Sequence, residues 1–375
     1  MAAKDHDIDV MMIGLRSVGG GQGGVERHVA CLAAQYERMG LRTCIVVRSP
    51  YGANDPSRLG ANTWTKSIWA PKHQFFEAPV HSVLATLYAA FKRPRVLHIH
   101  AIGPSIATPL ARILGLRVVC THHGEDYARE KWGATARYVL RFGERCQARF
   151  AHARICVSKG LSHRLSWEYR VAFEYVPNAV SPMRANPPYS TLAKFGLVPG
   201  RYIVNVGRLV PEKRQKDLIT AFAMLDRPEY KLVLVGAADH RSQYSSEVEK
   251  LATHTPGVIM AGFQQGETLA ELIGAAALFV LPSSHEGMPI AALEAMGLDR
   301  PVLLSNISPN LELALPAENY HVMGSTEDLA QRLRALLDSN PSDIVPTRDW
   351  SSSLVQFTWP IVAQQTVAIY GRVLH

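Results

Sequence analysis

Residues 279–297 read FVLPSSHEGMPIAALEAMG and predict a buried strand, a tight polar turn and a short helix. The apolar run over 276–281 predicts the strand, and Pro282 ends it because proline cannot donate to a ladder of strand hydrogen bonds. Pro289 suits the first helical turn, where a missing N–H costs nothing. Good helix formers then continue up to Gly297, which stands where a helix stop belongs.

The start of that helix lies between two glutamates and is the first candidate binding site. Free N–H groups at a helix start attract anions such as phosphate. Glu286 lies in the turn just before the helix, and Glu294 lies in its second turn. Carboxylates so placed can hold hydroxyls on both sides of a diphosphate, with Glu286 facing one sugar and Glu294 another. Glutamate is common on helices, so the spacing alone also agrees with coincidence.

Length and composition indicate a globular protein of two domains. A chain of 375 residues exceeds the usual size of a single core, and 47% hydrophobic with 19% charged residues argues against disorder. No apolar run approaches the ~20 residues of a membrane span, and the polar N-terminus lacks the apolar region of a signal peptide. The five cysteines are odd in number and lack metal-site spacing, which predicts buried free thiols in a reducing cytoplasm.

Positive charge is concentrated in the first half of the chain. Residues 1–185 hold 25 Lys and Arg against 13 Asp and Glu, a net charge of +12, whereas the remainder has a net charge of −4. This asymmetry indicates an anionic partner for the first half: nucleic acid, a phospholipid surface or a phosphorylated acceptor.

A helix predicted over 134–150 carries a basic stripe. Four arginines recur at every fourth position and therefore share one face: Arg137, Arg141, Arg145 and Arg149. Like charges repel one another, so a solvated face is the alternative interpretation, and Glu144 offsets only part of the charge. We favour contact with anionic lipid or with a diphosphate-linked lipid acceptor. Nucleic acid is less favoured because no known nucleic-acid motif accompanies the stripe.

A glycine-rich loop over 19–24 follows the first predicted strand (8–15) and precedes a helix that ends at Met39. A strand, a glycine-rich loop and a helix in this order can cradle phosphate, although a flexible loop is the alternative. No ribose-binding acid follows about 20 residues later, and no Gly-Lys-Ser/Thr closes a P-loop. Residues 49–80 show no regular period, and we expect an aromatic and basic loop there.

A predicted strand over 117–121 runs into His122-His123-Gly124-Glu125-Asp126. The carboxyl end of a parallel strand is where open α/β sheets place ligands. Paired histidines with nearby acids can also form a metal site. Adjacent strand residues point to opposite faces, however, and no third ligand is clearly placed, so we predict no metal there.

The second half restarts the alternation of strands and helices after a proline-rich linker near 181–190. A predicted strand over 202–206 ends in Gly207 and Arg208, and Lys213 follows shortly before the next helix. Arginine offers a planar fork and lysine a point charge, and together they suit a diphosphate. Surface salt bridging is the alternative for either residue alone.

Five motifs, taken in order, resemble the retaining glycosyltransferases of family 4: Gly23-Gly24-x-Glu26, Thr121-x-His123-Gly124, Pro177-Asn178, Gly207-Arg208 with Lys213, and Glu286 with Glu294. The resemblance implies an α/β chain with the GT-B fold, in which two Rossmann-like, doubly wound parallel-sheet domains face a central cleft. Residues 1–185 would bind the acceptor, and 190–356 the nucleotide sugar. The C-terminal helix, 357–375, would cross back to the first domain. Arg214 departs from the glycine common in relatives, which we expect to alter the turn.

The resemblance also implies residue roles. The expected catalytic residues are His123, Arg208, Lys213 and Glu286. The expected donor contacts are Gly23, Gly24, Gly207, Arg208, Lys213, Glu286, Gly287, Met288, Pro289 and Glu294. Acceptor contacts are expected at Asp126, Arg137 and Arg141. We expect no metal and no cofactor, because Lys and Arg offset the diphosphate charge and no Asp-x-Asp motif is present.

The resemblance predicts retaining transfer of a hexosyl unit from a nucleotide-diphosphate sugar to a glycan or polyprenyl-diphosphate-linked acceptor. Bacterial cell-surface polysaccharide synthesis is the expected process, and rhamnosyltransferase-like members are the subgroup that the chain resembles. The expected place is the cytoplasm, at the inner face of the cell membrane, with no nucleic-acid partner. The alternatives are an epimerase or hydrolase of sugar nucleotides with the same fold, and a non-catalytic anion-binding protein.

Overall fold

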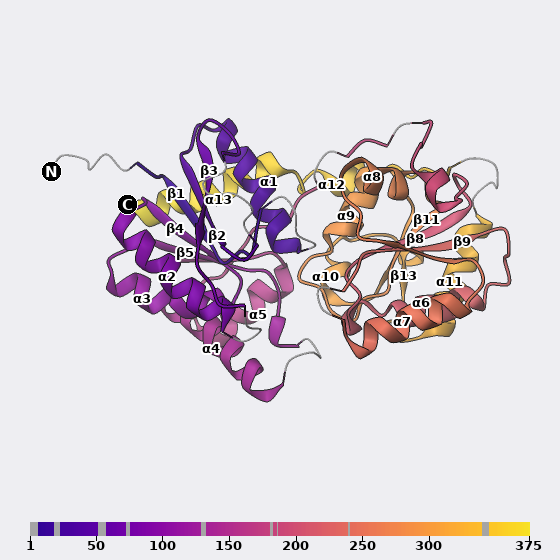
Figure 1. Cartoon of the computed structure of the whole chain (residues 1–375), viewed down its shortest axis with the longest axis horizontal. Helices are drawn as coiled ribbons and strands as arrows, with labels where there is room; N and C mark the ends of the chain where they lie inside the picture. The colour runs from indigo at the N-terminus through magenta and orange to yellow at the C-terminus, as the bar shows by residue number, and fades with distance from the viewer. Residues whose placement is uncertain are drawn as a thin grey trace. The chain divides into compact units, whose positions relative to one another are not determined.

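The computed structural model describes residues 7–18, 23–51, 58–72, 76–128, 133–180, 183–185, 187–238, 241–339 and 345–375. The chain divides into two compact units (Figure 1): unit 1 comprises Met1–Ala179 with Phe357–His375, and unit 2 comprises Val180–Gln356. The division therefore falls shortly before residue 185, where the sequence placed the end of the first domain. None of the described helices is both long enough and apolar enough to cross a membrane.

Unit 1 is built on a seven-stranded parallel sheet in the order β3-β2-β1-β4-β5-β6-β7. Its strands are β1 Val10–Ile13, β2 Thr43–Arg48, β3 Thr63–Ile68, β4 Val96–His100, β5 Val118–His122, β6 Ala153–Cys156 and β7 Glu174–Tyr175. Its helices are α1 Gly24–Arg38, α2 Glu77–Lys92, α3 Thr108–Ile113, α4 Ala134–Phe150, α5 Lys159–Tyr169 and α13 Trp359–Leu374, with short 3-10 turns η1 Pro104–Ala107 and η2 Asp126–Ala128. The predicted Rossmann-like architecture of the first domain is confirmed.

The expectation of a loop over 49–80 is wrong for two segments, which form the edge strand β3 and the start of α2. The strand was missed because it is polar: Thr63 and Thr65 are its buried residues. Glu37 of α1 anchors it by accepting hydrogen bonds from the Thr63 hydroxyl and from backbone N–H groups just before the strand. Hydrogen bonding and pairing with β2, rather than apolar periodicity, therefore define this strand.

The C-terminal helix α13 belongs to unit 1 and packs beside α1 over one face of the sheet (Figure 1). Its residues Trp359, Val362 and Ile369 lie in the same buried cluster as residues of α1 and of the central strands. The hydroxyl of Tyr36 on α1 donates to that of Tyr370, 2.9 Å away. The helix therefore completes the core of unit 1.

Unit 2 is built on a six-stranded parallel sheet in the order β10-β9-β8-β11-β12-β13. Its strands are β8 Tyr202–Val206, β9 Lys231–Val235, β10 Val258–Gly262, β11 Leu278–Leu281, β12 Val302–Ser305 and β13 Tyr320–His321. Its helices are α6 Gln215–Ala223, α7 Gln243–His254, α8 Gly266–Gly274, α9 Ile290–Gly297, α10 Ser308–Leu311, α11 Thr326–Asp338 and α12 Ser351–Leu354, with 3-10 turns η3 Leu192–Phe195, η4 Pro211–Lys213 and η5 Ala317–Asn319.

Both sheets reverse their strand order at one internal point. In unit 1 the reversal lies between β1 and β4, and in unit 2 it lies between β8 and β11. Open α/β sheets bind ligands outside the carboxyl ends of the strands at such a point. Residues that follow these four strands are therefore the first candidates for a functional site.

Candidate active site

The two motifs that flank the reversal point of unit 2 meet through an ion pair. Lys213 ends η4, which follows β8, and Glu286 lies in the turn after β11. The Lys213 Nζ atom lies 2.6 Å from Oε1 of Glu286, and the two side chains are 18% and 10% exposed. The backbone of the same turn is tied to η4 as well, since Ser284 N–H donates to the carbonyl of Glu212 at 2.9 Å. Two candidates that are far apart in sequence are therefore neighbours.

The loop after β8 runs unusually close to the end of β9. Gly236 has a φ of +139°, and a Cβ atom added to it would lie 2.0 Å from the carbonyl oxygen of Gly207. Only glycine fits such an approach, because the close contact and the positive φ both exclude a side chain. The sequence pointed to Gly207 but not to Gly236, whose role depends on a neighbouring strand.

Arg208 and Arg214 flank η4. Arg208 is partly buried, and its backbone carbonyl accepts a hydrogen bond from Nε2 of Gln215 at 2.8 Å. Arg214 takes the place of the glycine common in relatives, and it adopts the left-handed conformation (φ +51°) that glycine would adopt easily. Its guanidinium is held by Asp217 at 2.6 Å. Arg214 therefore adopts the backbone conformation that a glycine would adopt at this position.

The helix α9 begins at Ile290, so Pro289 is its N-cap residue rather than its first helical residue. Gly287 is partly buried and Met288 is buried just before this cap. Glu294 lies in the second turn of α9 and is only 2% exposed. Burial of a carboxylate is costly, and a polar partner offsets that cost. Its predicted contact with ribose stays a prediction.

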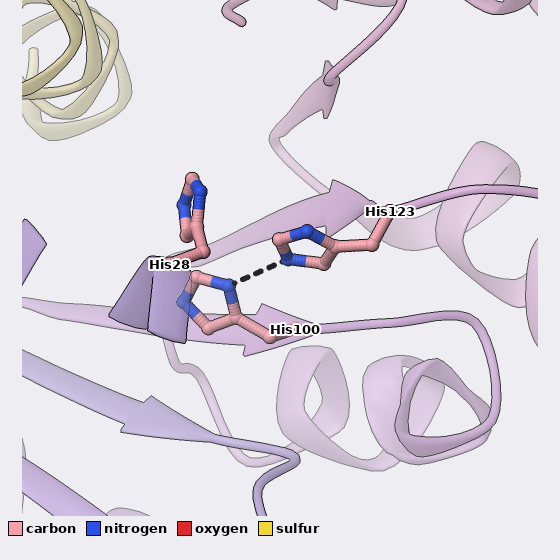
Figure 2. A group of neighbouring side chains, drawn as sticks. All are labelled: His28, His100 and His123. Atoms are coloured by element: carbon pink, nitrogen blue, oxygen red, sulfur yellow. Dashed lines mark hydrogen bonds between the residues drawn. The ribbon is translucent and has the colours of Figure 1, made fainter. Parts of the chain in front are cut away.

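In unit 1, His123 lies beside two other histidines (Figure 2). Nε2 of His123 is 3.1 Å from Nδ1 of His100, which ends β4, and the two rings stack. The ring of His28, from α1, meets the ring of His123 edge-on with 4.8 Å between centroids. Burial lowers the pKa of both His100 and His123 well below the ordinary value, and the neighbouring histidines lower each further. Burial therefore disfavours the protonated form of both side chains.

The glycine-rich motif leads into this histidine group. Gly23 caps α1 and Gly24 is its first residue, whereas residues 19–22 lie outside the described part of the chain. A Cβ atom on Gly23 would lie 1.7 Å from the carboxylate of Glu26, so the absent side chain makes room for that group. One turn further, Nδ1 of His28 meets Oδ1 of Asn178 at 2.7 Å. Burial lowers the pKa of His28 to about 4, although Asn178 opposes this shift.

His122 and His123 have different partners, as their alternation on the strand predicts. Nε2 of His122 lies 2.9 Å from the carboxylate of Glu144 on α4, which also accepts a hydrogen bond from the Tyr169 hydroxyl. These two hydrogen bonds of Glu144 are thus made with His122 and Tyr169 rather than with arginines of the stripe. Glu144 is buried on the inner face of α4, and its hydrogen bonds hold its pKa below the ordinary value against the opposing effect of burial.

The three predicted acceptor contacts lie near the basic helix. Asp126 begins η2, and Arg141 lies with its guanidinium over the ring of Tyr127 at 5.1 Å. All four arginines of the stripe are exposed, with Tyr138 and Phe142 exposed among them. The structure confirms one solvent-facing basic stripe and leaves its partner as a prediction.

Sequence reasoning missed the partners of His123. His98 and His100 alternate on β4 and therefore share a face, a signal that was available in the sequence. His28 and Asn178 carried no comparable signal, because they meet the strand ends only in the folded unit.

Comparisons with known proteins agree with this architecture. A family model described as "Glycosyltransferase Family 4" matches residues 22–184, and one described as "Glycosyl transferases group 1" matches residues 194–348. Alpha-maltose-1-phosphate synthase of Mycolicibacterium smegmatis is 28% identical over 74% of this chain and 79% of its own length. O-antigen chain mannosyltransferase B of Escherichia coli is 27% identical over 52% of this chain and 51% of its own.

Two solved structures show the same fold at low sequence identity. Sucrose-phosphate synthase from Thermosynechococcus elongatus has a TM-score of 0.79 at 19% identity, covering 97% of this chain and 98% of that one. Anabaena HepE, in complex with UDP and glucose, has a TM-score of 0.77 at 18% identity, covering 97% and 99%. At such identities the likeness concerns the fold alone. Together with the two family models, it shows that the chain belongs to the family 4 glycosyltransferases of the GT-B fold.

Proposed function

We propose that the chain transfers a hexosyl unit from a nucleotide-diphosphate sugar to a glycan or lipid-linked acceptor, with retention of anomeric configuration. The Lys213–Glu286 pair at the reversal point of unit 2 carries this proposal. An ammonium group has three donors, so Lys213 can hold Glu286 and still contact a phosphate. Glu286 would then orient the sugar hydroxyls beside that phosphate.

Relatives support a nucleotide-sugar donor and a surface-glycan product. HepE is described in complex with UDP-glucose as well as with UDP and glucose. Other relatives are described as an O-antigen mannosyltransferase and as a probable enzyme of teichuronic acid synthesis. We therefore propose a role in cell-surface polysaccharide synthesis. Other proteins of this architecture are described as an alpha-maltose-1-phosphate synthase and a sucrose-phosphate synthase, so the proposed surface-glycan product rests on the O-antigen and teichuronic acid relatives.

The proposed chemistry needs no metal ion. Cleavage of the bond between the anomeric carbon and the diphosphate leaves negative charge on the phosphate, which Arg208, Lys213 and the N–H groups at the start of α9 would stabilise. The acceptor oxygen would bond to the anomeric carbon on the face that the diphosphate leaves, and the acceptor proton would pass to the departing phosphate. His123 would contact the donor sugar, a role that rests on the resemblance of its motif.

A thermal-shift panel of UDP-, GDP-, ADP- and TDP-sugars tests the donor site. A donor present at about 100 times its dissociation constant should add about 2.7 kcal/mol to the free energy of unfolding. We expect stabilisation by donors of one base class, its loss in Lys213→Ala, and a fall in transfer rate of about 10²-fold or more in Glu286→Gln.

Lys216→Ala is the matched control, because Lys216 forms a similar ion pair with Glu247 at 2.7 Å on the exposed surface nearby. This variant should keep the shift and the transfer rate. If donors stabilise Lys213→Ala as much as they stabilise the parent, the Lys213–Glu286 pair is not part of the donor site. Donor turnover that needs no acceptor would favour the alternative of an epimerase or hydrolase.

We also propose that the basic stripe of α4 contacts an anionic membrane surface, where a lipid-linked acceptor is available. Its four exposed arginines are joined by exposed Tyr138 and Phe142, the side-chain types that suit a membrane interface. Each basic residue near an anionic surface contributes about 1 kcal/mol of binding.

Sedimentation with vesicles tests this surface. The protein should sediment with vesicles that contain phosphatidylglycerol and not with purely neutral vesicles. Charge reversal in the Arg137→Glu, Arg141→Glu double variant should weaken binding by at least about 10-fold. The double variant Lys250→Glu, Arg334→Glu changes net charge equally on exposed positions of unit 2 and should bind nearly as the parent does. Equal losses in both double variants would contradict a defined surface on α4.

A further inference from the structure

We propose that His28, His100 and His123 bind one divalent transition-metal ion of the zinc type at the carboxyl edge of the unit 1 sheet. One ring nitrogen from each residue lies within 4.8 Å of one from each of the others (Figure 2). The three residues come from α1, from the end of β4 and from just after β5. The site therefore exists only in the folded unit, at its reversal point, and all three of its ligands belong to unit 1.

The spacing of the nitrogens suits tetrahedral coordination. Metal–nitrogen bonds of about 2.0–2.1 Å place two ligating nitrogens roughly 3.3 Å apart. Nδ1 of His100 and Nε2 of His123 are already 3.1 Å apart in a hydrogen bond. The proton of this hydrogen bond has to leave the two nitrogens when both ligate an ion. His28 has to approach by roughly 1.5 Å at most for its nitrogen to reach the same spacing.

Asn178 provides the supporting contact that metal-bound histidines usually have. Its Oδ1 lies 2.7 Å from Nδ1 of His28, so Nδ1 carries the proton and Nε2 presents its lone pair. Asn178 is itself only 4% exposed, which keeps this hydrogen bond away from water. The tautomer of His28 is thus the one that a metal requires.

The group is also accessible to an ion from solvent. His123 is only partly buried, so one side of the group is open to solvent. Three protein ligands with an open fourth position form the arrangement in which zinc accepts an exogenous oxygen.

Imidazole ligands select zinc, copper, nickel or iron rather than magnesium or calcium. The proposed transfer reaction needs no metal, and His123 is its proposed sugar contact. An ion on His123 would therefore compete with the donor, so that zinc inhibits transfer. Binding itself is independent of that reaction and is measured without donor, so failure of one proposal is distinguishable from failure of the other.

The test uses the full chain without a histidine tag. Titration with Zn²⁺, followed by calorimetry, should show one ion per chain, and Co²⁺ in its place should give the visible absorption bands of a tetrahedral nitrogen site. His100→Gln and His123→Gln should each weaken Zn²⁺ binding by more than about 10-fold, and Asn178→Ala should weaken it by about 10–100-fold.

His163→Gln is the matched control, because His163 is an exposed histidine of the same unit and should not affect binding. Circular dichroism verifies that each variant is folded. Failure of the parent to bind Zn²⁺ would overturn the proposal. So would Zn²⁺ binding that folded His100→Gln and His123→Gln retain at parental strength, or the absence of tetrahedral Co²⁺ bands.

Discussion

At the residue scale, the path of the loop after β8 depends on the absence of a Cβ atom at Gly236. Gly236→Ala would place a methyl group 2.0 Å from the Gly207 carbonyl oxygen and force alanine into a φ of +139°. We expect the free energy of unfolding to fall by about 3 kcal/mol or more, as measured by urea unfolding.

Gly262→Ala separates the two causes. Gly262 also has a positive φ (+66°), but an added Cβ atom would meet nothing within 4 Å. Backbone strain alone should cost about 1–2 kcal/mol there. Equal destabilisation in the two variants would mean that the close approach of Gly236 to Gly207 does not contribute to the loss of unfolding free energy in Gly236→Ala.

At the scale of the element, Tyr370 connects α13 to the sheet of unit 1. Its hydroxyl accepts from Tyr36 at 2.9 Å and donates to Nδ1 of His98 at 2.6 Å. Nε2 of His98 then donates to the Thr121 hydroxyl at 2.7 Å. A chain of hydrogen bonds therefore runs from α1 through α13 to β4 and β5, within the buried interior.

Tyr370→Phe removes this link and leaves a buried nitrogen of His98 without its partner. We expect a loss of about 1–3 kcal/mol in the free energy of unfolding. Arg372→Ala on the same helix removes only an exposed ion pair with Glu174 and should cost at most about 1 kcal/mol. Thermal unfolding of both variants measures the difference, and a similar cost for both would contradict a structural role for the buried chain.

At the scale of the whole molecule, the two units should respond differently to acid. The histidines with a lowered pKa lie mainly in unit 1. Burial lowers the pKa of His81 and of His28 to about 4 and that of His98 to about 3. In the described part of unit 2, the pKa of His321 is lowered as well. The net charge of +12 over residues 1–185 makes further protonation in that half unfavourable.

These shifts have a definite sign. Below pH 6.5 a histidine binds a proton in the unfolded chain but stays unprotonated in the folded chain. Acid therefore stabilises the unfolded state, and the free energy of unfolding falls as pH falls towards about 4. Each such histidine contributes up to about 1.4 kcal/mol per pH unit in this range. Hydrogen exchange at pH 7 and pH 5 should therefore show protection lost first in peptides of unit 1.

His81→Gln tests one contribution. Nε2 of His81 contacts the carbonyl of Val47, and Arg48 lowers its pKa further whereas Glu77 raises it. The variant should show a shallower loss of stability between pH 6.5 and 4 than the parent, whatever its stability at pH 7. An unchanged slope would exclude His81 as a source of the acid sensitivity.

The sequence by itself determined the two-unit α/β architecture and the identity of most candidate residues. Continuous apolar runs such as 278–281 predict buried parallel strands because both faces of such strands are covered. The helix over 134–150 could also be predicted, because the spacing of residues along the chain indicates local structure. The edge strand β3 could not be predicted from the sequence, because it has no apolar pattern and depends on hydrogen bonds and on pairing with β2.

Only the tertiary structure decided which residues meet. The pairing of Lys213 with Glu286, the approach of Gly236 to Gly207 and the grouping of His28 with His100 and His123 each join segments that are distant in the chain. Such contacts follow from the strand order, which places the carboxyl ends of particular strands side by side. A linear pattern records the side chains available to a site, whereas the topology of the sheet decides which of them are neighbours.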